Sequence, residues 1–518
     1  MPRRSTLRTA AAGAAAAVGG LAAWDVVQRR HAILHNFPIV GHFRYLLEAV
    51  GPELRQYIVT SNDEERPFSR DQRAWVYMSS KAKRNTFGFG SDNDMEDVDD
   101  YLIIKHATPP WPAPEPGRPG SPPEHLVPSL KVLGAAHGRR HAFRPASIVN
   151  VSGMSFGALS ANAISALNLG AAAAPCLQNT GEGGLAPAHR HGGELIFQIG
   201  TGYFGCRDER GRFDLNRLQE TIAGAPVRAL EIKLSQGAKP GLGGMLPGRK
   251  VTPEIAAIRG VEPGKDCVSP THHSAFGSVP ELCDFVERLA EATGLPVGIK
   301  SAVGVGAFWD ELAMHMARTN TGPDYVLVDG GEGGTGAAPL AFSDHVALPF
   351  KIGFSRVFAR FAAEGLADDI VFIGSGRLGL PDAGLFALAL GCDMINVGRE
   401  AMMSIGCIQS QRCHTDRCPT GVATQNRWLT RGLEPVGKAE RAANYIRILR
   451  GEMLALAGTC GVPHPGLVGP DQLELIDTGF RARTVREVFG YEADWLAPRQ
   501  EQVAEAAALM AVAEAAES

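Results

Sequence analysis

The chain has 518 residues and a formal net charge of -4 at pH 7, with 45% hydrophobic and 20% charged residues. A chain of this length can form one or two domains with large buried cores. No basic stripe runs along it, so the sequence argues against nucleic acid as a partner. Its nine cysteines show no regular pairing, which favours a reducing compartment over a disulfide framework. The 61 glycines gather in short runs, as they do in turns that cradle a ligand.

An uncharged run rich in alanine and glycine occupies residues 9–24, with Arg3 and Arg4 before it and Arg29 and Arg30 after it. The run is shorter than the ~20 apolar residues that span a bilayer. Three interpretations remain open: a marginal membrane anchor, a twin-arginine export signal, and an alanine-rich helix or tail. Because arginines flank the run on both sides, they do not indicate which way it would be oriented across a membrane. We expect the protein in the cytoplasm or at the cytoplasmic side of a membrane.

The sequence predicts four regions. Residues 1–30 form the anchor or signal-like segment. Residues 31–125 form a helical extension that ends in a connection rich in proline and glycine at 109–123, because such residues favour extended or irregular backbone. Residues 126–435 form the main domain, and residues 436–518 form a helical C-terminal extension.

In the main domain, short β-rich apolar runs alternate with helical stretches, which is the pattern of parallel βα units. The predicted strands are 148–151, 176–178, 195–198, 230–233, 297–300, 325–328, 370–373 and 394–397. The clearest helical stretches between them are 160–173, 279–293, 308–318 and 382–390. Eight such units predict a (β/α)8 TIM barrel, and a doubly wound open sheet is the alternative. The barrel is favoured because nearly every strand ends in a polar or glycine-rich motif, as expected if the loops meet at one catalytic face.

The strand-end motifs supply the candidate site residues. In chain order they are Met154 and Ser155, Asn179 and Glu182, Lys233 and Lys239, Lys300, Gly333 and Gly334, Gly374, Gly376 and Arg377, and Gly398 and Arg399. A lysine inside a barrel is costly to bury unless it faces an anion or a reduced ring. Lys300 is therefore a candidate to face the N1/O2 side of a reduced flavin, and Lys233, Lys239 and Arg259 are candidates to hold a dicarboxylate. For each residue alone, a surface or salt-bridged position is the alternative.

Residues 331–336 and 374–379 both match G-x-G-x-x-G. A lone match is weak evidence for a dinucleotide site, and neither run has the expected ribose-binding acid at the end of the next strand. In a barrel, the loops after the seventh and eighth strands commonly bind phosphate. We therefore expect these glycines to form a phosphate cup, with charge from Arg377 and Arg399.

Three cysteines, Cys407, Cys413 and Cys418, stand in C-x5-C-x4-C spacing, and Pro419 follows the last. A proline after the final ligand is found in iron–sulfur loops, and three thiolates predict a cluster with three protein-ligated irons. One alternative is a loop of reduced structural thiols. Another is a zinc site completed by His414, although zinc sites usually have more closely spaced cysteine pairs.

Several motifs together resemble the FMN-binding synthase domain of glutamate synthase. They are residues 154–157, 179–184, 236–241 and 329–336 and the cysteine loop, in the order found in that family, and the resemblance covers about residues 125–430. It implies a (β/α)8 barrel, FMN, and a [3Fe-4S] cluster on the three cysteines. It also implies the family's reaction, the reductive amination of 2-oxoglutarate through 2-iminoglutarate with hydride from reduced FMN.

The resemblance also implies residue roles. Lys233, Lys239 and Arg259 match residues that bind 2-oxoglutarate, and Lys239 is in addition a catalytic candidate. Glu182 matches the glutamate near the ammonia entry, and Lys300 matches the lysine beside the flavin. The remaining strand-end residues listed above are expected to bind the cofactor.

The chain departs from the family in three respects. Met245 stands where the family has a glutamine that contacts the oxo acid, which puts the substrate in question. Neither an N-terminal glutaminase domain nor a glycine-repeat β-helix is evident, so ammonia is expected to arrive free or from a separate glutaminase. No NADPH-binding domain is evident, so electrons are expected from ferredoxin or a partner reductase. Two other functions remain open: a synthase for another amine or oxo acid, resembling N-methylglutamate synthase, and a non-catalytic electron-transfer subunit.

Overall fold

The computed structural model describes residues 3–28, 32–60, 64–86, 88, 90–91, 93–95, 98–112, 126–479 and 481–517. The chain divides into two compact units, residues 1–72 and 73–518. The predicted connection at 109–123 and the arginines after the alanine-rich run lie mostly outside the described residues.

The first unit is helical. It contains α1 (Arg3–Val27), α2 (Ala32–Asn36), α3 (Gly41–Leu54) and a π-helical turn at Arg55–Val59. Within α1, the 19 residues Thr9–Val27 have a mean hydropathy of 1.5, and this stretch is long and apolar enough to cross a membrane. A signal sequence has the same properties, so the three interpretations of this segment remain predictions.

The second unit is built on a closed barrel of parallel strands. These are β2 (Val149–Val151), β3 (Gln178–Asn179), β4 (Leu195–Ile199), β5 (Val227–Lys233), β8 (Val297–Ser301), β9 (Tyr325–Asp329), β10 (Val371–Ser375) and β11 (Met394–Val397). The last strand pairs with the first, with Ile395 opposite Val149. The predicted TIM barrel is therefore confirmed, and the open sheet is wrong. Each predicted strand overlaps an observed one.

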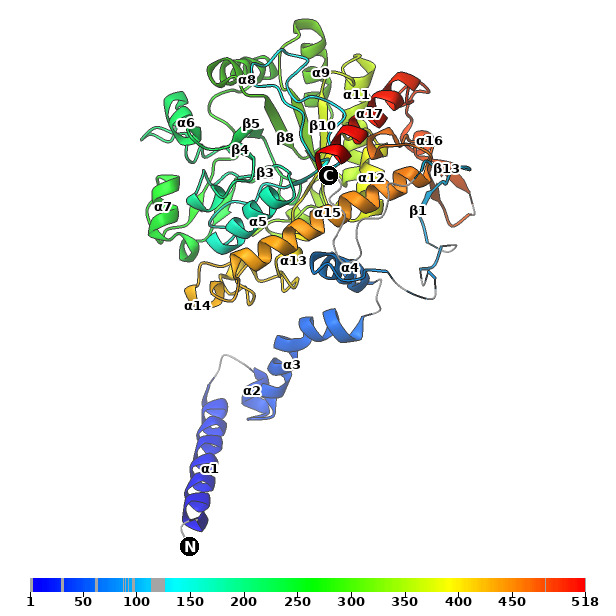
Figure 1. Ribbon diagram of the computed structural model, residues 1–518. Coiled ribbons are helices and arrows are strands. Elements are labelled where there is room, and N and C mark those ends of the chain that lie inside the picture. The colour runs from blue at the N-terminus through cyan, green and yellow to red at the C-terminus, as the bar shows by residue number, and fades with distance from the viewer. Residues whose placement is uncertain are drawn as a thin grey trace. The chain divides into compact units, whose positions relative to one another are not determined.

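Helices surround the barrel and follow its strands (Figure 1). They are α5 (Ala161–Ala173), α6 (Leu215–Ile222), α8 (Val279–Thr293), α9 (Ala307–Thr319), α11 (Phe350–Ala363) and α12 (Pro381–Ala389). Local signals explain their ends. In α8, the Ser278 side chain accepts a hydrogen bond from the Glu281 backbone N–H, and Gly294 ends the helix at φ 75°, a conformation that glycine adopts without strain.

Shorter elements lie in the connections. They are α4 (Arg70–Ser80), β6 (Met245–Leu246), β7 (Cys267–Val268), α7 (Pro253–Arg259), α10 (Leu340–His345), α13 (Arg399–Ser404), α14 (Arg427–Thr430), α16 (Val485–Phe489), and 3-10 turns at Pro187–His189, Gly248–Lys250, Cys413–Thr415 and Pro465–Leu467. The C-terminal part also contributes two long helices, α15 (Pro435–Thr459) and α17 (Gln500–Glu517). Helix α15 packs along α5 (Figure 1).

A small antiparallel sheet adds to the helices and loops expected in residues 31–125 and 436–518. It consists of β1 (Tyr101–Ile104), β12 (Leu473–Ile476) and β13 (Ala482–Thr484), with Tyr101 opposite Ile476. A four-residue apolar run has too few residues to show a period of its own. Its pairing partner lies far away in the sequence, so no local pattern indicated this sheet.

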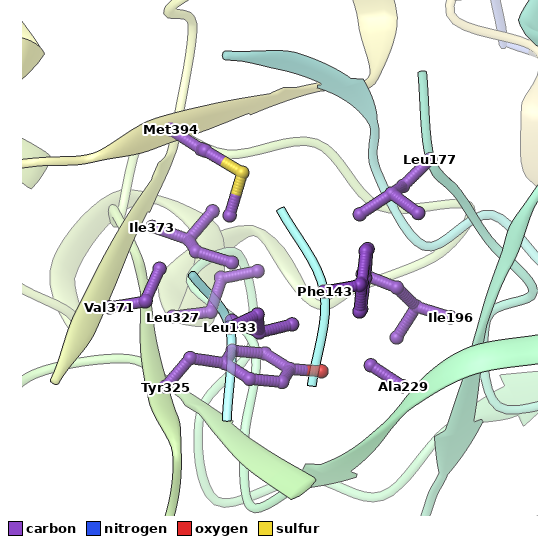
Figure 2. Close-up of a cluster of buried hydrophobic side chains, with 10 residues drawn as sticks. All are labelled: Leu133, Phe143, Leu177, Ile196, Ala229, Tyr325, Leu327, Val371, Ile373 and Met394. Carbon is purple, nitrogen blue, oxygen red and sulfur yellow. The ribbon is translucent and has the colours of Figure 1, made fainter. Parts of the chain in front are cut away.

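The barrel interior changes from apolar to polar along the strands. Figure 2 shows the apolar floor, where side chains of the strands meet Leu133 and Phe143 from the preceding segment. Strand side chains alternate between faces, so residues two positions beyond the floor also point inward. These positions hold Asn179, Gln198, Glu231, Lys300, Asp329, Ser375 and Asn396, all of them buried. We call these seven residues the polar ring.

Candidate active site

The polar ring is not fully satisfied by its own hydrogen bonds. Asn179 Nδ2 and Gln198 Nε2 both donate to Glu231 Oε1, at 2.9 and 2.6 Å. Within the described part of the chain, Glu231 Oε2 and both polar atoms of the Asn396 amide are buried without a partner. Buried polar groups in native proteins nearly always have partners, so this arrangement is that of a site for a polar ligand.

Lys300 is buried and ion-paired in the same ring. Its Nζ lies 3.5 Å from Asp329 Oδ2, and the two side chains are 7% and 9% exposed. Burial opposes the charged form of Lys300, but the carboxyl groups of Asp329 and Glu231 outweigh it and hold the lysine pKa above its usual value. Lys300 thus places a positive charge inside the barrel. Lys300 forms a salt bridge, which was the alternative interpretation of its sequence position. It also faces the interior of the barrel.

Four predicted residues come together beside the ring. Lys233 Nζ lies 2.7 Å from Glu182 Oε1 and 2.6 Å from Gln236 Oε1. Burial alone would raise the pKa of Glu182, but the charges of Lys233, Lys239 and Arg259 lower it. Glu182 is therefore an ionised carboxylate among three cations. We call Glu182, Lys233, Lys239 and Arg259 the cationic cluster.

Backbone and hydroxyl oxygens position two of these cations. Lys239 Nζ donates to the Ala337 carbonyl at 2.9 Å. Arg259, the last residue of α7, donates from Nη2 to Ser155 Oγ at 3.3 Å and to the Phe156 carbonyl at 3.0 Å. These contacts join the loops that follow β2, β5 and β9. They hold the cations in place before any substrate binds.

A close backbone approach at Gly237 allows two of these loops to meet. A Cβ atom at this position would lie 1.8 Å from the Gly330 carbonyl oxygen, and a backbone oxygen cannot move aside cheaply. The Gly237 N–H also donates to Asp329 Oδ2 at 2.9 Å. The glycine therefore connects the loop after β5 to the carboxylate that pairs with Lys300.

Replacing Gly237 by alanine is expected to lower the free energy of unfolding by about 1–3 kcal/mol, as overpacking does in other tightly packed sites. Urea unfolding followed by circular dichroism would measure the change. Gly304→Ala is the matched control, because a Cβ atom at Gly304 would meet nothing within 4 Å. Equal stability of the two variants would contradict the expectation.

The residues predicted to form a phosphate cup lie at or beyond the ends of β9, β10 and β11. Gly374 is the penultimate residue of β10, and Gly398 follows β11. Arg399 packs against the loop after β9: a Cβ atom at Gly334 would lie 2.8 Å from Arg399 Cδ, and Arg399 Nη2 donates to the Glu332 carbonyl. A Cβ atom at Gly398 would make only an ordinary van der Waals contact with Ser152 Cβ, at 3.6 Å. The other predicted members, Gly333, Gly376 and Arg377, lie in the same loops.

The three cysteines of the loop after α13 are free thiols. Burial, together with the nearby Cys413 and Cys418, raises the pKa of Cys407 to about 12. The thiols therefore influence one another, and thiols are the donors that an iron–sulfur cluster uses. Among the residues that the structure describes, however, no three Cys, His, Asp or Glu side chains are close enough to hold a metal ion. The same finding applies to the zinc alternative with His414.

The sequence interpretation missed three polar-ring residues that the strand-end motifs did not include: Gln198, Glu231 and Asn396. All three lie inside strands rather than in the loops that follow them. A polar residue in an otherwise apolar strand was the available signal. Its significance depends on which strand face points inward, and the structure supplies that information.

Comparison with known proteins places the chain in a family. Residues 134–463 match the family described as the conserved region in glutamate synthase. The glutamate synthase large subunit-like protein YerD of Bacillus subtilis is 37% identical over 471 residues, which are 85% of this chain and 89% of that protein. The chain belongs to the glutamate synthase family. It is accordingly an oxidoreductase of the class that acts on CH–NH2 donors.

Other members of the family match a shorter part of the chain. The archaeal glutamate synthase (NADPH) of Methanocaldococcus jannaschii is 37% identical over 319 residues, covering 61% of this chain and 59% of that one. The ferredoxin-dependent glutamate synthase of Cyanidium caldarium is 32% identical over 60% of this chain and 20% of its own length. Among solved structures, a mutant flavocytochrome b2 with pyruvate bound has a TM-score of 0.42 at 14% identity, covering 82% of this chain and 91% of that one.

Proposed function

We propose that the protein catalyses the reductive amination of 2-oxoglutarate to glutamate with FMN as its hydride carrier. The observation that carries this proposal is the cationic cluster beside the polar ring. A dicarboxylate needs two positively charged contacts, and three cations lie close enough to Glu182 to lower its pKa. Arg259 presents the planar fork that binds a carboxylate through two hydrogen bonds. The names of the relatives support the same reaction.

The residues present fit FMN. Its ring carries both hydrogen-bond donors and acceptors, and Glu231 Oε2 and the Asn396 amide offer unpaired partners of both kinds. Lys300 suits the ring edge that becomes negative on reduction. Arg377, Arg399 and the glycine loops after β10 and β11 suit the phosphate. Bound FMN would supply hydride to the substrate.

The chain's own residues account for binding and proton handling. Lys233, Lys239 and Arg259 would hold and orient the two carboxylates of the oxo acid. Glu182, ionised beside Lys233 at 2.7 Å, would accept a proton from the incoming nitrogen donor, because its carboxylate is deprotonated at neutral pH. Ammonia and the oxo acid then form an imine and water, and hydride plus a proton converts the imine to glutamate.

The electron and nitrogen supply are part of the same proposal. Cys407, Cys413 and Cys418 would hold a [3Fe-4S] cluster that receives electrons from a ferredoxin or a partner reductase. Ammonia would arrive free or from a separate glutaminase. Helix α1 would tether the protein to the cytoplasmic side of a membrane. The cysteine spacing supports the cluster, and the length of the apolar helix supports the tether.

Anaerobic purification followed by absorption spectroscopy, electron paramagnetic resonance and an assay of glutamate formation tests the proposal. We expect FMN, a three-iron signal that Cys418→Ser abolishes, and turnover of 2-oxoglutarate with ammonia and a chemical reductant. Flavin and iron without turnover of any oxo acid would favour the electron-transfer subunit instead. Absence of both cofactors after reconstitution would contradict the proposal.

One observation favours a second substrate assignment. Met245 on β6 is half-exposed and pairs across the hairpin with the exposed Val268. Its neighbour Gly244 lies against the cationic cluster, since a Cβ atom there would be 2.4 Å from Glu182 Oε1. An apolar edge at this place suits an amine with an alkyl group, as in an N-methylglutamate synthase-like reaction. Faster turnover with methylamine than with ammonia would establish this alternative.

A further inference from the structure

Glu231 is held in an unusual way for a buried carboxyl group. It lies on β5 with no exposed surface. The amides of Asn179 and Gln198 both donate to one of its oxygens, Oε1, at 2.9 and 2.6 Å. The orientation of Asn179 is fixed independently, because its Oδ1 accepts from the Gly181 N–H at 2.9 Å. Both lone pairs of Oε1 are therefore in use.

The other oxygen, Oε2, is buried and has no hydrogen-bond partner among the described residues. An ionised oxygen left this way would lose its hydration without compensation. A neutral carboxyl group avoids that loss. Its proton must then sit on Oε2, because Oε1 already accepts two hydrogen bonds and a hydroxyl oxygen is the poorer acceptor. Burial raises the pKa of Glu231, which agrees with this assignment.

The charged groups around Glu231 act in both directions, because Lys300 lowers its pKa and Asp329 raises it. Lys300 faces it from β8, and Asp329 and the Tyr325 phenol face it from β9, while β3 and β4 present only the two amides. Lys300 and Asp329 form an ion pair with no net charge. A neutral Glu231 leaves the whole ring without net charge, whereas an ionised one would repel any anionic ligand bound above it.

We propose that Glu231 is a ligand-binding residue that acts as a neutral carboxylic acid and donates a hydrogen bond from Oε2 to an acceptor atom of the group held in the polar ring. The ligand class is a planar ring with a carbonyl oxygen or unprotonated nitrogen at its edge. Identifying that ring as the flavin rests on the proposed function. A carboxyl group kept neutral at pH 7 by its site can serve as such a donor. Across the ring, the unpartnered Asn396 amide offers a second contact.

Two substitutions separate a neutral donor from an ionised group. In Glu231→Gln, the side-chain oxygen can accept from both amides while the NH2 group donates from the position of Oε2. We expect this variant to bind FMN to the apoprotein as tightly as the wild type does. Glu231→Leu has no donor, and we expect its FMN dissociation constant to rise about tenfold, the effect of losing one net hydrogen bond. Glu291→Gln, on the exposed face of α8, is the matched control.

A readout on the apoprotein keeps this test independent of the flavin. The infrared difference spectrum between wild type and Glu231→Gln should contain the band of a protonated carboxyl group at neutral pH. Because the folded-state pKa of Glu231 is raised, the stability of the wild type relative to the glutamine variant should fall as the pH rises above ~4.3, the unfolded value.

The outcomes distinguish the two proposals. A carboxyl band together with tight FMN binding by the glutamine variant supports the role of Glu231. Absence of the band, or a glutamine variant that binds FMN as weakly as the leucine variant, overturns it. If the wild-type protein binds no flavin, the cofactor part of the proposed function fails, and the infrared band then decides the protonation state of Glu231 by itself.

Discussion

Replacing Lys233 by methionine is expected to lower kcat/KM for the oxo acid by about a hundredfold. Methionine keeps the length of the side chain but removes its charge and its contact with Glu182, which measures 2.7 Å. Hydrogen bonds to charged groups contribute up to ~3 kcal/mol, and every ~1.4 kcal/mol is a factor of ten in rate. Steady-state kinetics of glutamate formation would measure the loss.

The same variant should also move the pH dependence. The pKa of Glu182 is raised by burial and lowered by Lys233, Lys239 and Arg259, and the lowering prevails. Without Lys233 the pKa of Glu182 rises, so the acidic limb of the kcat/KM profile should shift to higher pH. Lys265→Met is the control, because Lys265 is 70% exposed in its pair with Glu262. If the acidic limb does not shift, Glu182 is not the group that accepts the proton.

Replacing Lys300 by methionine is expected to lower the free energy of unfolding by about 3–5 kcal/mol, the cost of leaving one partner of a buried ion pair uncompensated. The partner left without a counter-charge is Asp329, whose side chain is 9% exposed. Denaturant unfolding of the apoprotein would measure the loss. Lys105→Met is the matched control, because the pair of Lys105 with Glu474 is 40% and 26% exposed, and exposed pairs contribute only ~0–1 kcal/mol.

The pH range of this effect follows from the direction of the pKa shift. Burial opposes the charge on Lys300, but Asp329 and Glu231 raise its pKa above the ordinary value. A raised lysine pKa stabilises the fold below the unfolded value of ~10.4, and the contribution is lost only as the pH rises through the folded value. The difference between wild type and variant should therefore be constant between neutral pH and about pH 9. A difference that disappears near neutral pH would mean that Lys300 is not charged in the folded protein.

Local patterns were enough to place most of the barrel. The predicted helix 279–293 coincides with α8 (Val279–Thr293) because its N-cap serine and C-terminal glycine are local signals. The β-strands were located to within a few residues because their apolar runs are bounded by polar or glycine-rich turns. The small sheet of β1, β12 and β13 was missed, since its pairing is between the two ends of the second unit.

For the candidate site too, local motifs predicted some features and only the tertiary structure showed the others. The strand-end residues Glu182, Lys233, Lys239 and Lys300 could be named from the sequence because motifs after parallel strands converge on one face. Their pairing could not be named: Lys233 contacts Glu182, 51 positions earlier in the chain, and Lys300 pairs with Asp329 on the next strand. Such contacts depend on strand order and register, which do not appear in a single sequence.

By itself, the sequence determined the barrel class, the glycine loops, the cationic residues and the cysteine spacing, because each of these is a local pattern of residue types. Only the tertiary structure decided which strand positions face inward. Gln198, Glu231 and Asn396 lie far apart in the sequence, and the closed barrel brings them into one buried polar ring above the apolar floor. The physical reason is that the alternation of a strand defines two faces, and only barrel closure makes one of them the interior.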